Sequence, residues 1–141
     1  MKNTLLFGGG ITILVLLGAW WMSAPSSDSP IVSQGGLHWH PELEIYVGDE
    51  KQEIPQDLGL INGHSPIHTH DDLPIIHLEF GGLVREEDIM LSRFFEVWGE
   101  EFGSTSLLGN TGEVEMRVNG ELNTEYGSYV MKDGDRIELR I

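Results

Sequence analysis

Residues 37–47 read LHWHPELEIYV and carry the clearest strand pattern of the chain. Three apolar side chains, Leu43, Ile45 and Val47, recur at every second position. Residues two apart in a strand share a face, so this alternation predicts one strand with a core-facing side and a polar side. The polar side carries His38, His40, Glu42, Glu44 and Tyr46.

Further strands are predicted on both sides of one helix. Gly48-Asp49 indicates a turn into a short returning strand at 51–54, and residues 75–80 (IIHLEF) alternate again, with Ile76, Leu78 and Phe80 on one face. Strands are also expected at 114–118 and 136–141, with turns at Asn119-Gly120 and Asp133-Gly134.

The helix is expected over residues 86–98. Leu91, Phe94, Phe95 and Trp98 are spaced to form one apolar stripe, and Gly99 supplies the stop. The order strand, strand, strand, helix, strand, strand predicts an α+β domain: a small mixed sheet with one packed helix, in a β-grasp-like arrangement.

The N-terminal part is expected to lie outside this domain. Residues 5–22 (LLFGGGITILVLLGAWWM) carry no charge, and as a helix they would span about 27 Å, close to the thickness of a bilayer core. Lys2 before them and the acidic bulk after them place the N-terminus in the cytoplasm and the domain outside. A cleaved signal peptide is the alternative. We therefore expect a membrane anchor at 1–22, a flexible Ser/Pro/Gly linker at 23–36 and the folded domain at 37–141.

Composition narrows the choice of partners. The 23 acidic and 8 basic residues give a formal net charge of −15, which repels phosphate backbones and argues against nucleic acid as a partner. The chain has no cysteine, so disulfides and thiolate metal sites are excluded. A metal site must then use imidazole, carboxylate, thioether or backbone-oxygen ligands, which favours copper, iron or a catalytic type of zinc site.

All six histidines lie within residues 38–77. In extended chain, residues two apart share a face, so two pairs of imidazoles can each point toward one ion. Five histidines are predicted to converge as metal ligands: His38, His40, His68, His70 and His77. Asp71, Asp72 and Glu79 are expected nearby, as ligands or as partners that orient an imidazole. His64 is expected to be an ordinary surface residue.

The motifs that contain these histidines recur in a known pattern. His38-x-His40, His68-Thr-His-Asp71, Ile76-His-x-Glu79, Phe94-Phe-x-x-Trp-Gly99, Val118-Asn-Gly120 and Asp133-Gly-Asp-x-Ile137 occur here in this order. The sequence resembles an uncharacterised family of small membrane-anchored bacterial and archaeal proteins. That resemblance implies that the five histidines belong to a shared pattern, and it implies no activity. The C-terminal motifs also resemble the closing hairpin of β-grasp sulfur carriers, but those end in Gly-Gly and this chain ends in Leu-Arg-Ile.

Three functions remain open from the sequence. The first is a membrane-anchored extracytoplasmic protein that binds copper or zinc. The second is a mononuclear metalloenzyme, a hydrolase or an oxidase, with Asp71 or Glu79 as a base. The third is a metal-free interaction module whose histidines sense pH.

Overall fold

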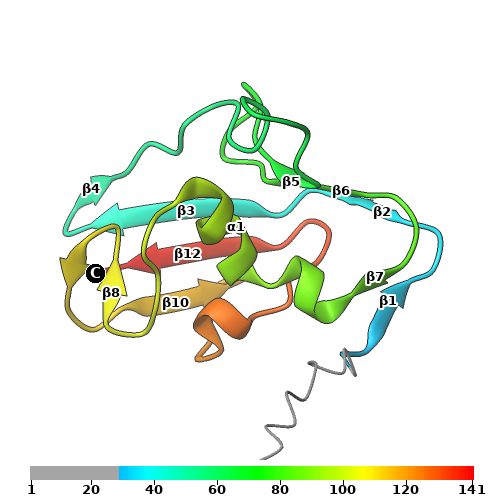
Figure 1. Cartoon of the computed structure of the whole chain (residues 1–141). Helices are drawn as coiled ribbons and strands as arrows, with labels where there is room; N and C mark the ends of the chain where they lie inside the picture. Colours follow the sequence, from blue (N-terminus) through cyan, green and yellow to red (C-terminus); the bar gives the residue numbers. More distant parts are fainter. Residues whose placement is uncertain (1–28) are drawn as a thin grey trace, which may run out of the picture.

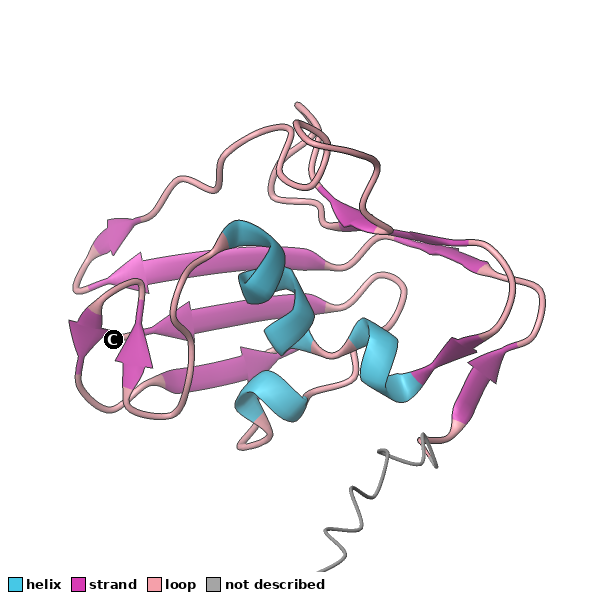
Figure 2. Cartoon of the chain, in the orientation of Figure 1, coloured by secondary structure: helices cyan, strands magenta, loops and turns pink. Residues whose placement is uncertain are grey.

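The computed structural model describes residues 29–141. They form a mixed α+β domain made mostly of strands, with one short packed helix (Figure 2). The fold class is confirmed in these terms. The anchor expected at 1–22 and the first part of the expected linker lie outside the described residues. Within residues 29–141, none of the helices is long and apolar enough to cross a membrane.

The larger sheet has five strands, and its two central strands come from opposite ends of the domain. In spatial order the strands are β11 (Glu121–Leu122), β10 (Glu115–Val118), β12 (Arg136–Arg140), β3 (Glu42–Val47) and β4 (Glu50–Lys51). β12 runs parallel to β3 and antiparallel to β10, and these three strands lie side by side behind α1 (Figure 1).

The alternation predicted for β3 is present at Leu43 and Ile45, whereas Val47 at the end of the strand is only partly buried. Leu43 and Ile45 are fully buried, opposite Ile137 and Leu139 of β12. Their shared face packs into the hydrophobic core together with aromatic residues of the helix. Removal of these aliphatic side chains from water supplies the main stabilisation of the sheet, at about 1.5–3 kcal/mol for each fully buried side chain.

The predicted helix is interrupted. Residues 86–98 form a 3₁₀ helix, Glu86–Ile89, and then α1, Leu91–Trp98, with extended backbone at Met90 between them. The expectation of one continuous helix is therefore wrong. Met90 pairs as an isolated β-bridge with Val130, and the N–H of Leu91 donates to the carbonyl of Tyr129. These tertiary hydrogen bonds compete with the helical ones at this point.

The end of the helix agrees with the prediction. Gly99 adopts a left-handed conformation with φ of 80°, and its N–H donates to the carbonyl of Phe95. Leu91, Phe94 and Phe95 are buried, and Trp98 is partly buried against the same core. The apolar stripe therefore faces the core, as its spacing indicated.

A second sheet has three strands, and each of them carries one histidine. In spatial order they are β2 (Leu37–Trp39), β6 (His77–Phe80) and β5 (Ile67–His68). The expectation of one strand over residues 37–47 is wrong, because β2 and β3 belong to different sheets. Pro41 lies between them and has no N–H to offer a ladder. Around it, His40 N–H donates to Asp133 Oδ1 and Glu42 N–H to the carbonyl of Asp135.

Shorter elements complete the fold. They are the antiparallel pair β1 (Ile31–Ser33) and β7 (Val84–Arg85), the antiparallel pair β8 (Ser106–Leu107) and β9 (Asn110–Thr111), and the 3₁₀ helix Tyr126–Ser128. β1 lies within the segment 23–36 that was expected to be linker. Its pairing with β7 joins that end of the segment to the domain.

Candidate metal centre

One face of the three-stranded sheet is lined with imidazoles. The register places His38 opposite Glu79 and His68 opposite His77, and directly opposite residues project from the same face of a sheet. The residues that alternate with them, Ile67 and Leu78, are buried in the core on the other face. The sheet therefore separates an apolar side from a side made of potential metal ligands.

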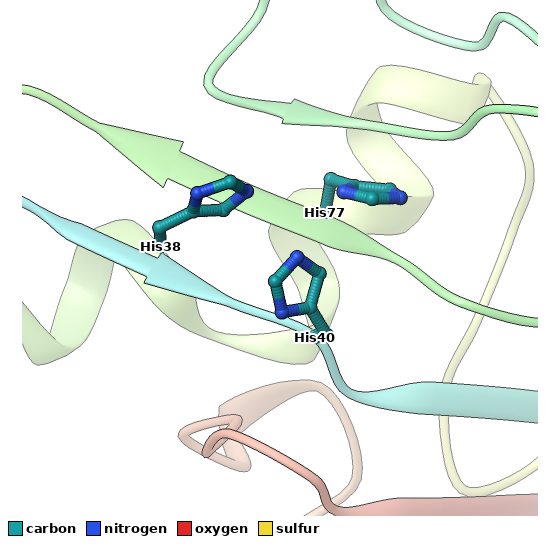
Figure 3. A group of neighbouring side chains, drawn as sticks. All are labelled: His38, His40 and His77. Atoms are coloured by element: carbon teal, nitrogen blue, oxygen red, sulfur yellow. The ribbon is translucent and has the colours of Figure 1, made fainter.

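Three histidines form an outer triad at one end of this face, shown in Figure 3. Their ring centroids are 4.6 Å apart for His38–His40, 5.0 Å for His40–His77 and 6.4 Å for His38–His77. One ring nitrogen from each lies within 4.8 Å of the others. The hydrogen bond from the His40 backbone to Asp133 fixes the chain where β2 ends, so the triad has a defined backbone.

A central triad follows along the same face. His68, His70 and His77 also bring three ring nitrogens within 4.8 Å of one another. Their ring centroids are 4.7–5.4 Å apart, and the rings of His68 and His77 are stacked with an interplanar angle of 10°. His77 is thus common to the outer and the central triads, and the five histidines expected to converge do lie together.

His68 has the most constrained ring in the cluster. Its Nδ1 lies 3.0 Å from the carbonyl oxygen of Ser65, which can only accept a hydrogen bond. Nδ1 therefore carries the proton, and Nε2 carries the lone pair. That Nε2 is buried and has no hydrogen-bond partner, in a residue that is 1% exposed. A backbone carbonyl on one ring nitrogen with the other left free is the usual arrangement of a metal-ligating histidine.

Burial favours the neutral form of the His68 ring, which is the form that binds a metal ion. Burial lowers the pKa of His68, because a low-dielectric environment disfavours the charged imidazolium. A metal ion binds the neutral form, so no proton has to be displaced from His68 near pH 7. An unpaired buried polar atom is costly on its own, and coordination of an ion would satisfy it.

The acidic neighbours differ in their contacts. Both carboxylate oxygens of Asp72 lie 3.1 Å from His77 Nε2, and this hydrogen bond lowers the pKa of Asp72. Glu79 Oε2 lies 3.9 Å from His68 Nε2. Asp71 is exposed and makes no hydrogen bond to a histidine anywhere in residues 29–141. Of these two neighbouring aspartates, Asp72 is the one whose carboxylate contacts a histidine.

The structure adds His64, which was expected to be an ordinary surface residue. His64, His68 and Glu79 form a third group with ligand atoms within 4.8 Å of one another, and the rings of His64 and His68 are 5.1 Å apart. His64 lies in a loop, where the sequence shows neither helix nor strand periodicity. The one sequence signal is that it falls inside the 40-residue window that holds every histidine of the chain.

These distances suit a first-row transition ion after small side-chain rotations. A tetrahedral ion with metal–nitrogen bonds of about 2.0–2.1 Å holds its ligands roughly 3.4 Å apart. Each group must therefore contract by about 1.5 Å or less, which rotation about χ1 and χ2 supplies without a change in the backbone. The histidine groups can hold a metal ion.

The class that fold and site together define is a small α+β domain with an imidazole-rich candidate metal centre on the face of a three-stranded sheet. Comparison with protein-family models, with curated proteins and with solved structures finds no match to this chain.

Proposed function

We propose that this protein binds copper or zinc through imidazoles of the cluster, on the extracytoplasmic face of a membrane. The observation that carries the proposal is the ring of His68. Its buried Nε2 has no hydrogen-bond partner among the described residues, and His68 belongs to two of the three groups that could hold an ion. The ordinary role of a histidine buried for packing would leave no such atom unsatisfied.

The donor set favours copper and zinc over other ions. With no cysteine in the chain, the ligands are imidazoles and carboxylates, and imidazole suits both metals. Divalent copper binds such sites more tightly than zinc by intrinsic affinity order. The formal net charge of −15 supports the proposal, because it raises the local concentration of cations.

Several finer features belong to the same proposal. The apolar segment at 5–22 would anchor the chain in the lipid bilayer as a single span, with residues 37–141 outside. The parallel pair β3–β12 at the centre of the larger sheet supports a β-grasp-like description of the domain. The six motifs that carry the resemblance support membership of the family of small anchored proteins.

A metalloenzyme is the second candidate, and one observation favours it. Each group offers three ligands rather than four, and each includes at least one exposed or half-exposed side chain. Catalytic zinc sites typically have three protein ligands and an open position for water or substrate. With Glu79 beside His68 Nε2, a carboxylate is present to accept a proton from such a water.

The test is metal analysis of the full-length chain, purified without a histidine tag. The protein is equilibrated with limiting copper, zinc and iron together, freed of unbound metal, and measured by elemental analysis. We expect a stoichiometric ion in the wild type and a large loss in His68→Ala/His70→Ala. Because His68 is buried, His38→Ala/His40→Ala serves as a second variant that is less disruptive to the fold, and it should also lose bound metal.

Asp71→Ala is the matched control, since Asp71 is exposed and contacts no histidine. It should retain the full complement of metal. If the wild type retains no metal, the proposal fails, and a cluster that titrates with pH becomes the better account of the six histidines.

A further inference from the structure

The three histidine groups overlap in an informative way. The outer triad (His38, His40 and His77) and the group of His64, His68 and Glu79, here called the distal site, have no residue in common. The central triad shares His77 with the first and His68 with the second. A neutral imidazole has a single lone-pair nitrogen and so ligates one ion. An ion in the central triad therefore excludes both of the others, whereas the two ends can be filled together.

We propose that the cluster binds two ions at once, one in the outer triad and one in the distal site. This inference rests on the proposed function, because it assumes that the cluster is a metal centre. It goes further in assigning His64 and Glu79 as ligands of a second ion. Six imidazoles also exceed what a single four-coordinate ion can use; the two sites together use five of them, and only His70 is in neither.

The distal site has its own rigid support. The ring of His68 is held by the carbonyl of Ser65, and its unpartnered Nε2 faces Glu79 Oε2 at 3.9 Å. The backbone of Glu79 is held in turn, because its N–H donates to the carbonyl of Pro66 at 2.7 Å. Two of the three ligands thus come from paired strands and need only side-chain rotation to bind.

The distal site also has access to solvent. It borders a surface pocket of about 310 Å³ that is lined by His64, Ser65, Pro66, His68, Glu79, Phe80 and Gly81. His64 and Glu79 are both exposed, and they form the rim through which an ion would enter. Water in the pocket would complete the coordination sphere, so the ion would keep a position open to an added ligand.

The two sites differ in donor chemistry. The outer triad offers three imidazoles, whereas the distal site offers two imidazoles and a carboxylate, a combination typical of catalytic zinc and of non-haem iron. The carboxylates also limit the repulsion between two neighbouring dications. Glu79 would neutralise part of the charge at the distal site, and Asp72, which is hydrogen-bonded to His77, would do so at the outer triad.

The experiment is a zinc titration of the full-length chain without a tag, with bound zinc measured by elemental analysis after removal of the free ion. Two equivalents are expected for the wild type. One equivalent is expected for His64→Ala/Glu79→Gln and one for His38→Ala/His40→Ala. These variants avoid the buried His68, and circular dichroism checks that each is folded. Glu121→Gln removes an exposed carboxylate in β11 and should keep two equivalents.

The outcomes distinguish a failure of the two-ion inference from a failure of the proposed metal-binding function. A single equivalent in the wild type would mean one ion in the cluster; it would overturn this inference and leave the proposed function standing. Two equivalents retained in His64→Ala/Glu79→Gln would also overturn it, because the second ion would then lie elsewhere. No zinc, and no copper in a parallel titration, would refute the proposed function itself.

Discussion

The two sheets of this domain both alternate apolar and polar residues along their strands, but their polar faces differ. The polar face of the five-stranded sheet satisfies its own charges: Arg140 Nε lies 2.7 Å from Glu138 and its guanidinium stacks 4.0 Å above the ring of Tyr46, while Lys51 pairs with Glu44. The polar face of the three-stranded sheet instead leaves a buried nitrogen of His68 without a partner. We conclude that the polar face of a sheet indicates a binding site where its polar groups are buried and unpaired.

The largest effect is expected in the five-stranded sheet. Leu139→Ala removes a fully buried side chain from β12, the strand that pairs with both β3 and β10. The lost burial and the remaining cavity should lower the free energy of unfolding by about 2–5 kcal/mol, measured by urea denaturation. The protein that remains folded should bind as much metal as the wild type. A change in the number of bound ions would show that the two sheets are not separate in function.

A smaller effect, on zinc affinity rather than on stability, is expected beside the three-stranded sheet. Asp72→Ala removes the carboxylate that hydrogen-bonds to His77 and should weaken zinc binding by about 10–100-fold, as loss of such orienting partners usually does. Competition with a chelator of known affinity gives the change in Kd. Asp71→Ala is the control and should lie within about twofold of the wild type. Equal losses in the two variants would mean that overall negative charge, rather than the contact to His77, sets the affinity.

The smallest effect is a pH dependence of the metal-free protein. Burial lowers the pKa of His68 below its ordinary value of 6.5, so the unfolded chain takes up this proton at a higher pH than the folded chain does. Stability from His68 is therefore fully present above about pH 6.5, and it is lost as the pH falls from there toward the folded-state pKa. The pKa of Asp72 is lowered from 3.8, so its contribution is lost only at more acidic pH.

Urea unfolding of the metal-free protein at pH 7.5 and at pH 5.5 measures this dependence. In His68→Gln the difference between the two pH values should become smaller, because the titrating group is gone. An unchanged difference would show that other groups cause it. This would also weaken the distinction between the sheets, since the burial of His68 would then have no energetic consequence.

Much of the fold follows from local pattern. The alternation around Ile45, the alternation around Leu78 and the stop at Gly99 were all predicted and are all present. Asn119 and Gly120 both adopt positive φ between β10 and β11, as a tight turn requires. Each of these features depends on residues that are close together in the sequence. The local sequence is therefore enough to specify it.

The errors share a different cause. The strand expected over 37–47 is divided at Pro41, and the helix expected over 86–98 is interrupted at Met90. At both places the backbone pairs with a segment far along the chain, near Asp133 and Tyr129 respectively. Local periodicity contains no information about such partners, and their hydrogen bonds outweigh a weak local preference.

The candidate site divides in the same way. That His38 with His40, and His68 with His70, come as pairs follows from the short spacing within each pair, which allows two imidazoles to point to one place. That these pairs meet at His77 depends on tertiary structure, because it requires the register of β2 and β5 on either side of β6. The tertiary structure also brought in His64 from a loop, and of the two expected aspartates it placed Asp72 rather than Asp71 against His77. The sequence shows which side chains could bind a metal. Their convergence depends on strand pairing between distant segments, and a local sequence pattern contains no information about that pairing.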